Sequence, residues 1–515
     1  MKKRKVILSV VLIIVLVIVS SAIISFMNKA EKIEAMLKVA YKLLDEGKYD
    51  KAIIEFENVI EIEPNNIEAR FALVEVYESK GEINTSIKYL EEILVIDEKN
   101  EDAYYKLANL LIENGDLEKA IDILELGINK IGSEKLQILL ESLNSEESTT
   151  NKIGLSDPEK VIIFKDKNFE NEVRELYGIN NEKIRWKDIG YIEELKFEAK
   201  EKIDTIEDLK WFVNLTDLKI RGDVEGNIKI LSELSMLEYL DLAQTKVRGD
   251  LNLISKLLKL KKIYLWETLV TGDLKSLEYL KKLEKISLGG IQLTGNISIL
   301  SNLEELVQIT LHETSVTGNI KKLNKLKKLE SIALEDTLVE GNINDLKELI
   351  NLDYLNLDSE SIKGDIRSLS KMENLELLYL SKTAVTGNIM NLKELKNMKD
   401  LQLYETVVEG DIKYLAKMNN LNYLDLSLTS IKGDISNLKE LKNIEYLLLD
   451  ATYVEGNINN LSKIEKLKMV HLWETSVSGD ISSLSTLKKL DNLDLYNTKC
   501  VGKLKLSNGE VIDLD

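Results

Sequence analysis

The stretch Asp400-Leu401-Gln402-Leu403-Tyr404-Glu405-Thr406-Val407-Val408-Glu409-Gly410-Asp411-Ile412 shows the unit that recurs through the second half of the chain. Its glycine belongs to a series whose members are separated by one constant interval, twenty-three positions, without interruption. A constant period in this range indicates stacked repeats, because one unit alone cannot bury its apolar residues. The series consists of Gly226, Gly249, Gly272, Gly295, Gly318, Gly341, Gly364, Gly387, Gly410, Gly433, Gly456, Gly479 and Gly502.

Apolar residues stand at fixed distances from each glycine. Leucines nine and seven residues earlier, such as Leu401 and Leu403, lie on one face of a short strand because strand side chains alternate. Apolar residues every third position after the glycine suit a 3₁₀ segment on the return path. Each glycine is expected to adopt positive φ at a turn, and Asp or Asn follows every glycine except Gly502, which Lys503 follows.

This pattern resembles that of the leucine-rich repeat family, which implies a β-solenoid in the form of a horseshoe or arc. Ten of the thirteen copies have Thr four residues before the glycine, as at Thr245 and Thr406, where the family often has Asn. We therefore predict a ladder of threonines whose hydroxyls bond neighbouring backbone groups. A calcium ladder along the Asp and Asn positions is the alternative, and it is disfavoured because half of these residues are neutral Asn.

Composition narrows the classes of function. The formal charge of −19 argues against a nucleic-acid partner and against an anionic membrane surface as the ligand. The single cysteine, Cys500, occupies an apolar slot of the repeat, so we predict a buried thiol rather than a nucleophile. The sequence contains no metalloprotease motif, phosphate-binding glycine loop or cysteine–histidine cluster. We therefore expect no enzymatic activity and no cofactor.

The chain begins with a basic tail and an apolar segment, residues 1–30. Four basic residues precede residues 6–26, which carry no charge and are long enough to span a bilayer as a helix. The basic residues favour an N-terminus inside and the bulk of the chain outside. We expect a single-pass anchor in the cell membrane, and a cleavable signal peptide ending near Ser20-Ser21-Ala22 is the alternative.

A helical pattern with a longer period, thirty-four positions, occupies residues 31–145. Gly47, Gly81 and Gly115 mark the period, and small residues recur at Ala52 and Ala120. This pattern is similar to the tetratricopeptide repeat in three copies, followed by a capping helix near Leu136–Leu143. The resemblance implies a helical solenoid whose concave groove binds a peptide or a partner helix. A spacer that lifts the second domain from the membrane is an equally weighted interpretation.

The remaining segments are predicted to connect and close the repeats. Residues 146–157 are polar and form a linker, and residues 158–214 resemble the helical cap that precedes leucine-rich repeats in exported bacterial proteins. In that cap we expect Phe169, Val173, Leu176 and Tyr177 to share the apolar face of a helix. Trp186 and Trp211 are expected to belong to the cap core. The leucine-rich repeats extend over residues 215–505, and residues 506–515 form a capping hairpin with its turn at Asn508-Gly509.

The exposed slots of the repeated strands form the expected concave face, and they are rich in aromatic residues. The chain is only 6% aromatic, yet half of its tryptophans and both of its histidines fall in these slots. The two histidines are seven repeats apart, or about 34 Å along the stack, so they cannot share a metal. The predicted ligand-binding residues are Tyr264, Trp266, His312, Tyr379, Tyr404, His471, Trp473 and Tyr496.

Two functions follow from this surface. In the first, an outward-facing, membrane-anchored bacterial scaffold or adhesin binds a protein or peptide ligand on the concave face, because rigid aromatic residues are favoured interface anchors. In the second, the face binds a cell-wall or host glycan, with rings stacked on sugars and the carboxylates of the recurring aromatic-Glu-Thr triplets bonded to hydroxyls. Rings that merely pack against one another along the sheet are the structural alternative to both.

Overall fold

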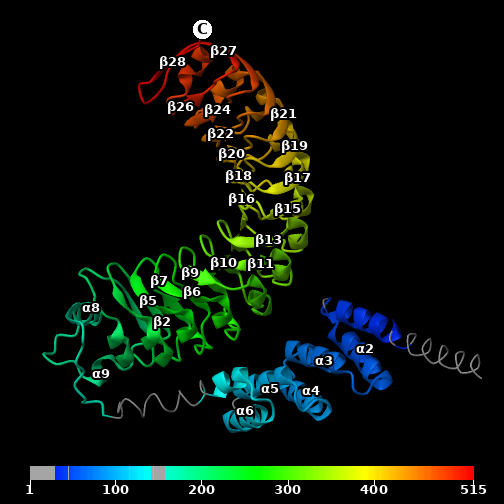
Figure 1. The fold of residues 1–515 in the computed structure, drawn as a ribbon, viewed down its shortest axis with the longest axis vertical. Coiled ribbons are helices and arrows are strands. Elements are labelled where there is room, and N and C mark those ends of the chain that lie inside the picture. Colours follow the sequence, from blue (N-terminus) through cyan, green and yellow to red (C-terminus); the bar gives the residue numbers. More distant parts are fainter. Residues whose placement is uncertain are drawn as a thin grey trace, which may run out of the picture. The chain divides into compact units, whose positions relative to one another are not determined.

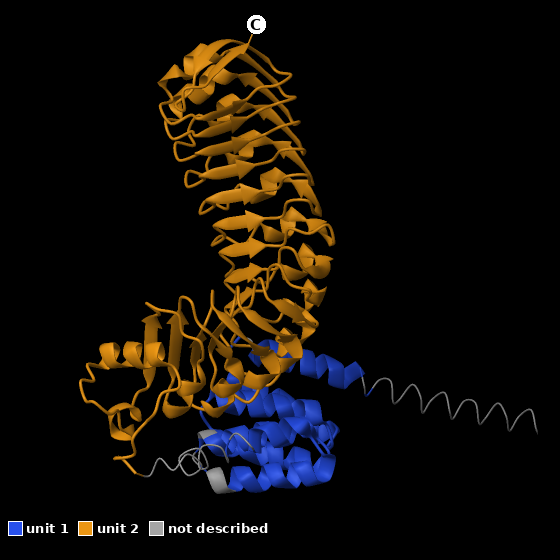
Figure 2. Ribbon diagram, turned by 60° about the vertical axis from the view of Figure 1, so that its left-hand side comes forward, with its two compact units in different colours: residues 1–144 blue, residues 145–515 orange. Residues whose placement is uncertain are grey.

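The computed structural model describes residues 29, 31–44, 46–114, 116–140, 143 and 157–514. The chain divides into two compact units, residues 1–144 and 145–515 (Figure 2). The predicted anchor at residues 6–26 and nearly all of the predicted linker lie outside the described residues. Within the described ranges, no helix combines the length and the apolar character that a membrane crossing requires.

The first unit is a stack of antiparallel helices, which confirms the predicted tetratricopeptide architecture. A helix at residues 31–44 precedes the stack and another at residues 134–140 follows it. Ala52, Ser86 and Ala120 are fully buried where the helices approach closely. Gly47 and Gly81 have positive φ in the turns between helices, as a glycine at a helix end allows. The intervening helices are α2 (Tyr49–Ile62), α3 (Ile67–Ser79), α4 (Ile83–Ile96), α5 (Glu101–Glu113) and α6 (Leu117–Ile131).

A cap with two helices, α8 (Lys167–Tyr177) and α9 (Trp186–Ile189), begins the second unit. Phe169 and Val173 are fully buried on α8, as predicted. The prediction for Leu176 is wrong, since this side chain is 44% exposed at the last turn of the helix. Trp186 and Trp211 are partly buried against the apolar core, in agreement with their expected role in the cap.

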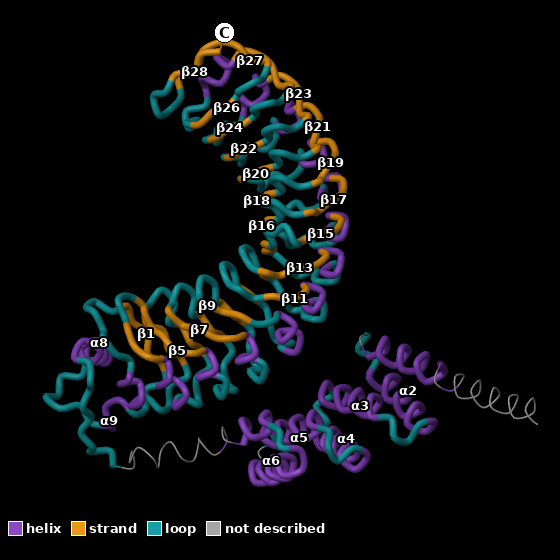
Figure 3. The backbone as a smooth tube through the Cα atoms, viewed as in Figure 1, coloured by secondary structure: helices purple, strands orange, loops and turns teal. Residues whose placement is uncertain are grey.

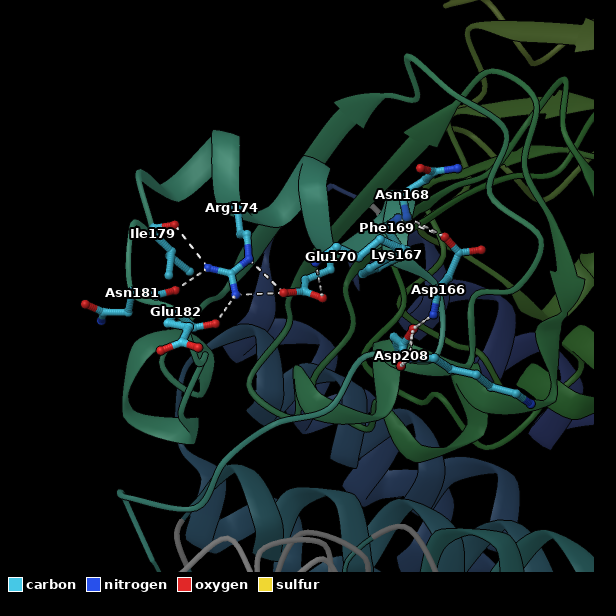
Figure 4. A network of polar contacts seen from close by, with 11 residues as sticks. Asp166, Lys167, Asn168, Phe169, Glu170, Arg174, Ile179, Asn181, Glu182 and Asp208 are labelled. Carbon is cyan, nitrogen blue, oxygen red and sulfur yellow. Dashed lines mark hydrogen bonds and ion pairs between the residues drawn. The ribbon is translucent and has the colours of Figure 1, made fainter.

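A buried carboxylate holds this cap together (Figure 4). Asp208 is fully buried on the 3₁₀ helix η1 (Glu207–Trp211), and its oxygens accept hydrogen bonds of 2.8 Å from the backbone N–H groups of Lys165 and Asp166. Asp166 in turn caps α8 by accepting from the N–H groups of Asn168 and Phe169. Burial raises the pKa of Asp208, and the two backbone donors oppose that rise.

A parallel sheet of fourteen short strands forms one side of the solenoid, here called the inner sheet (Figure 1). Each strand pairs in register with the next repeat, so equivalent residues form columns across the sheet. The strands are β1 (Glu194–Glu198), β2 (Asp217–Arg221), β4 (Tyr239–Asp241), β6 (Lys262–Tyr264), β8 (Lys285–Ser287), β10 (Gln308–Thr310), β12 (Ser331–Ala333), β14 (Tyr354–Asn356), β16 (Leu377–Tyr379), β18 (Asp400–Gln402), β20 (Tyr423–Asp425), β22 (Tyr446–Leu448), β24 (Met469–His471) and β26 (Asn492–Asp494).

The opposite side of the solenoid carries two outer sheets of four and ten strands. An isolated bridge between Asn296 and Thr317 lies between them, next to the repeat in which Ile291 stands in place of threonine. The strands are β3 (Glu225–Asn227), β5 (Lys246–Asp250), β7 (Leu269–Asp273) and β9 (Gln292–Thr294), then β11 (Thr317–Asn319), β13 (Leu338–Asn342), β15 (Ile362–Asp365), β17 (Ala384–Asn388), β19 (Val407–Asp411), β21 (Ser430–Asp434), β23 (Tyr453–Asn457), β25 (Ser476–Asp480), β27 (Lys499–Lys505) and β28 (Val511–Leu514).

A 3₁₀ helix follows each outer strand from β3 to β25, as the three-residue spacing predicted (Figure 3). The leucine columns of the inner strands and of these helices form one continuous core. The helices are η2 (Ile228–Glu233), η3 (Leu251–Ile254), η4 (Leu274–Leu277), η5 (Ile297–Asn302), η6 (Ile320–Leu323), η7 (Ile343–Leu346), η8 (Ile366–Leu369), η9 (Ile389–Leu392), η10 (Ile412–Leu415), η11 (Ile435–Leu438), η12 (Ile458–Lys463) and η13 (Ile481–Thr486).

The turn chemistry of each repeat agrees with the prediction. The thirteen glycines have φ between 97° and 146°, a region that L side chains avoid. The Asp or Asn that follows accepts a hydrogen bond from the second residue after it and so caps the 3₁₀ helix, as Asp411 does for Lys413. The threonine hydroxyls donate to the carbonyl three residues earlier in their own repeat, as Thr406 does to Leu403 at 2.8 Å.

The last repeat is closed by an antiparallel hairpin of β27 and β28. The prediction of strand, Asn508-Gly509 turn and strand is confirmed, although the first strand starts earlier, at Lys499. The Asn508 side chain donates to the carbonyl of Asp491, which ties the hairpin tip to the end of the stack. Cys500 is buried in β27, and burial raises the pKa of its thiol.

Candidate ligand-binding face

The inner face comprises the residues of the inner sheet that stand ten, eight and six positions before each glycine from Gly249 to Gly502, together with the residues of β1 and β2 in the same columns. These side chains alternate with the buried leucines and therefore point away from the core. The eight residues predicted to bind a ligand all lie here, in two columns of the sheet. The column six positions before the glycines holds Trp266, His312, Tyr404, Trp473 and Tyr496, and the column eight positions before them holds Tyr264, Tyr379 and His471.

Some of the aromatic rings predicted to bind a ligand pack against neighbouring rings. The ring centroids of Tyr239 and Tyr264 are 5.6 Å apart, and those of Tyr354 and Tyr379 are 5.7 Å apart. Packing along the sheet therefore explains Tyr264 and Tyr379. In the described part of the chain, Tyr404, Trp473 and Tyr496 contact no other ring, and Tyr496 is 73% exposed.

Trp266 already has a cation against its ring. The guanidinium carbon of Arg221 lies 5.6 Å from the ring centroid, and Nη2 of this arginine is 2.8 Å from Oδ2 of the buried Asp241. Arg221 also donates to the carbonyl of Ala243 at 2.6 Å. At the N-terminal end of the inner face, a guanidinium of the chain itself thus occupies the place between a carboxylate and an aromatic ring.

The two histidines lie beside carboxylates on different repeats. His312 lies over Gly289, where an added Cβ would approach Nε2 to 2.3 Å, so a larger residue there would displace the ring. His312 faces Glu335, whose Oε2 atom is buried without a hydrogen-bond partner. Nδ1 of His471 is 3.7 Å from Oδ2 of Asp450.

The sequence prediction missed the carboxylates of the inner face. Burial raises the pKa of Asp358 and of Asp450 to about 6, and it also raises the pKa of Glu335, Asp400 and Asp425. These residues occupy the same slots as the rings, so the repeat alignment contained the signal. It was overlooked because acidic residues are common throughout the chain and do not stand out as aromatic residues do.

The recurring aromatic-Glu-Thr triplets have a structural explanation. Glu267, Glu313, Glu405 and Glu474 have φ between 53° and 56°, and the threonine after each one donates its hydroxyl back to the strand. The triplet therefore encodes the tight turn that leaves the inner strand. The glutamate side chains are exposed at this turn and stand beyond the strand positions that carry the rings.

The described residues provide no group of three or more His, Cys, Asp or Glu side chains that could hold a metal ion. The Asp and Asn residues after the glycines, which the calcium alternative would need, instead cap the 3₁₀ helices through Oδ1.

Comparisons with known proteins agree with this architecture. The family described as tetratricopeptide repeat matches residues 43–93 and 80–141. None of the curated proteins matches the sequence significantly. Solved structures of receptors resemble part of this chain at identities of 24% or less, a level that shows the fold alone.

Three receptor structures illustrate the similarity. A TDR receptor has 24% identity and a TM-score of 0.54, over 62% of this chain and 58% of that one. The Arabidopsis receptor kinase HAESA, solved with the peptide hormone IDA and the co-receptor SERK1, has 24% identity and a TM-score of 0.52, over 62% and 56%. The plant peptide hormone receptor RGFR1, in complex with RGF2, has 22% identity and a TM-score of 0.51, over 60% and 56%.

This chain covers between one half and two thirds of the length of each receptor. Together, the geometry and the comparisons establish a helical tetratricopeptide region followed by a parallel-sheet leucine-rich repeat solenoid.

Proposed function

We propose that this protein is an interaction scaffold that binds a protein or peptide ligand on its inner face. The main support for this proposal is a set of partly exposed aromatic rings that face solvent and contact no other ring in the described chain, namely Tyr404, Trp473 and Tyr496. Rigid aromatic side chains lose little entropy on binding and are enriched at interface hot spots. HAESA and RGFR1, which share the fold, were solved with bound peptides, and this supports the proposal by analogy.

The test uses the full chain against an unbiased displayed peptide library and an array of cell-wall and host glycans. The affinity of each selected binder is then measured for the unmodified chain and for the variants Trp473→Ala and Trp266→Ala. A protein ligand is expected to lose about 2 kcal/mol of binding free energy at one dominant ring. A long glycan would instead lose smaller amounts at both tryptophans, which would favour the glycan-binding alternative.

Tyr453 supplies the matched control for the inner face. It lies on β23 of the outer sheet and is 72% exposed, whereas Tyr496 is 73% exposed on the inner face. Tyr496→Ala is expected to weaken binding, and Tyr453→Ala is expected to leave it unchanged. Equal losses from both variants would show that any exposed ring suffices, and the inner face would then have no special role.

We also propose that residues 6–26 anchor the protein in the cell membrane with both repeat units outside. The support is the sequence alone, through the apolar run and the basic residues that precede it. Protease added to intact cells should digest the repeats, and the mass of the retained N-terminus should include Met1 to Phe26. Protection of the repeats from protease would reverse this orientation.

A further inference from the structure

The C-terminal part of the inner face contains no lysine or arginine. From Gln308 to Tyr496, the positions ten, eight and six residues before the glycines hold neither lysine nor arginine, although the chain has 69 of them. The equivalent positions of β1 to β8 hold five: Lys196, Lys219, Arg221, Lys262 and Lys285. We call the surface from Gln308 to Tyr496 the acidic strip. Its carboxylates are Glu335, Asp358, Asp400, Asp425, Asp450 and Asp494.

Three of these carboxylates form a diagonal row. Asp400, Asp425 and Asp450 lie on successive repeats, and each stands two positions further along its strand than the one before. Strand spacing and side-chain alternation place neighbouring carboxylates about 8 Å apart. The like charges interact, since the charge of Asp425 contributes to the raised pKa of both of its neighbours in the row, Asp400 and Asp450.

None of the three has a lysine or arginine partner in the described chain. Asp400 accepts from the Tyr379 hydroxyl at 3.0 Å and from Gln402 Nε2 at 3.1 Å. Asp425 accepts from the backbone N–H of Ser427, and Asp450 from that of Trp473. His471 is the one ionisable nitrogen near the row among the described residues.

Two lysines at one rim of the strip are already paired. Lys399 and Lys468 form ion pairs with Glu376 and Glu445, one column outside the strip. Lys468 also lies 5.6 Å from the ring centroid of Tyr446. These cations therefore neutralise the rim and leave the carboxylates of the diagonal row to another partner.

The N-terminal end of the same sheet shows which kind of cation such carboxylates can bind. There, the buried Asp241 holds the guanidinium of Arg221 beneath the ring of Trp266. The acidic strip repeats the combination of buried or half-buried carboxylates and aromatic rings without supplying a lysine or arginine. The buried Oε2 atom of Glu335 is an acceptor without a hydrogen-bond partner in the described chain, and it is a second sign that this face lacks a donor.

We propose that the acidic strip binds an extended segment of a partner protein that carries arginine or lysine at alternate positions. Side chains on one face of an extended chain repeat about every 6.6 Å, and flexible basic side chains span the remaining difference to the carboxylate row. Arginine suits the site because its planar guanidinium can bond a carboxylate and stack on a ring together. This inference rests on the proposed function and specifies the chemistry of the ligand.

The test uses the full chain at pH 7.5 and a short, fluorescein-labelled peptide of alternating arginine and serine. A matched peptide with citrulline in place of arginine keeps the planar shape and part of the N–H donors, but it carries a carbonyl oxygen in place of one nitrogen and has no charge. Fluorescence anisotropy should show binding of the arginine peptide that weakens as salt is added, because partly exposed ion pairs are screened. The citrulline peptide should bind about tenfold more weakly or not at all.

The double variant Asp425→Asn with Asp450→Asn tests whether the peptide binds on the acidic strip. Asparagine keeps the oxygen that accepts from Ser427 and Trp473 and removes the charge. The control Asp434→Asn with Asp480→Asn removes the same charge from two exposed turns after glycines. The strip variant should lose about tenfold in affinity for the arginine peptide, and the control should lose little.

Equal losses in both double variants would show attraction to the net charge alone and would overturn the proposal. Equal binding of the arginine and citrulline peptides to the unmodified chain would overturn it too, and this comparison holds even if the strip variant fails to fold. If neutral library peptides bind through Tyr496 and Trp473 while the arginine peptide does not bind, the proposed function stands and the basic ligand is rejected.

Discussion

Single hydroxyl groups close the turn of ten repeats, and the contribution of each can be measured. Thr406→Val keeps the shape of the side chain but leaves the carbonyl of Leu403 without its donor. We expect a loss of about 1 kcal/mol in the free energy of unfolding, measured by urea denaturation. Thr271→Val is the control, because this exposed threonine on β7 makes no side-chain hydrogen bond in the described chain. A similar loss in both variants would assign the effect to strand propensity.

The carboxyl group of Asp450 makes stability depend on pH. Its pKa of about 6 in the folded protein exceeds the usual value of about 3.9, so the folded state binds the proton more tightly. Stability should therefore be greatest below pH 4 for this group and decline as pH rises through 6. The Asp450 side chain is only 5% exposed. Asp450→Asn should therefore raise the free energy of unfolding by about 2 kcal/mol at pH 7.5 and reduce the dependence of stability on pH.

Asp480→Asn is the control for this pH dependence. The backbone N–H of Ser482 lowers the pKa of Asp480, so its contribution to the pH dependence lies below pH 4. Stability between pH 4 and 6 should keep the parent slope in this variant. The explanation fails if Asp450→Asn retains the full slope while Asp480→Asn loses it.

Residue-scale prediction from the sequence succeeded where the repeat dictates the environment. The burial of Cys500, the positive φ of the glycines and the hydroxyl bonds of the threonines all follow from slot positions. The sequence could not show which rings would pair, because pairing depends on side-chain rotamers on adjacent strands. It also could not show that Asp358 and Asp450 become half-buried or buried, since that depends on the side chains of three successive repeats.

At the scale of elements, the N-terminal cap depends on one buried carboxylate. Asp208→Ala would leave the backbone N–H groups of Lys165 and Asp166 without acceptors, and Asp166 positions the start of α8. We expect a loss of about 3 kcal/mol and faster proteolytic cleavage within α8. The adjacent Glu207→Ala removes only an exposed ion pair with Lys165 and should change the stability little. Similar losses of stability and similar rates of proteolysis in the two variants would contradict the role given to Asp208.

The elements themselves were predictable because their periods differ. The first unit has the longer period and small residues at the helix contacts, and this pattern indicates helices. In the second unit, alternating leucines recur at the interval of the glycine series and indicate strands. The cap has no repeat, so its interpretation rested on one amphipathic stretch, and Leu176 at the end of that stretch was misplaced. The Asp208 network was not predictable, because Lys165 and Asp208 are far apart in the sequence.

On the scale of the whole molecule, each repeat of the solenoid contacts chiefly its neighbours, so a complete repeat should be dispensable. Deletion of residues 401–423 joins Asp400 to Leu424, which occupies the same slot as Leu401. The shortened chain should unfold with a midpoint close to that of the parent. Deletion of residues 401–422 instead shifts one strand by a residue and should cost about 2 kcal/mol or more, because a buried leucine turns outward. Urea denaturation of the two proteins distinguishes a register effect from a length effect.

The unbroken, equal spacing of the glycines also has a consequence for the gene. Equal repeats in the protein correspond to equal, in-frame repeats in the DNA, and misaligned recombination between such repeats inserts or removes whole units. Every product of recombination between internal repeats keeps the same cap and the same closing hairpin, because these lie at the two ends of the series. Lineages that carry this gene can therefore differ in the number of repeats, and each gain or loss lengthens or shortens the inner face by one row of side chains without a new fold having to arise.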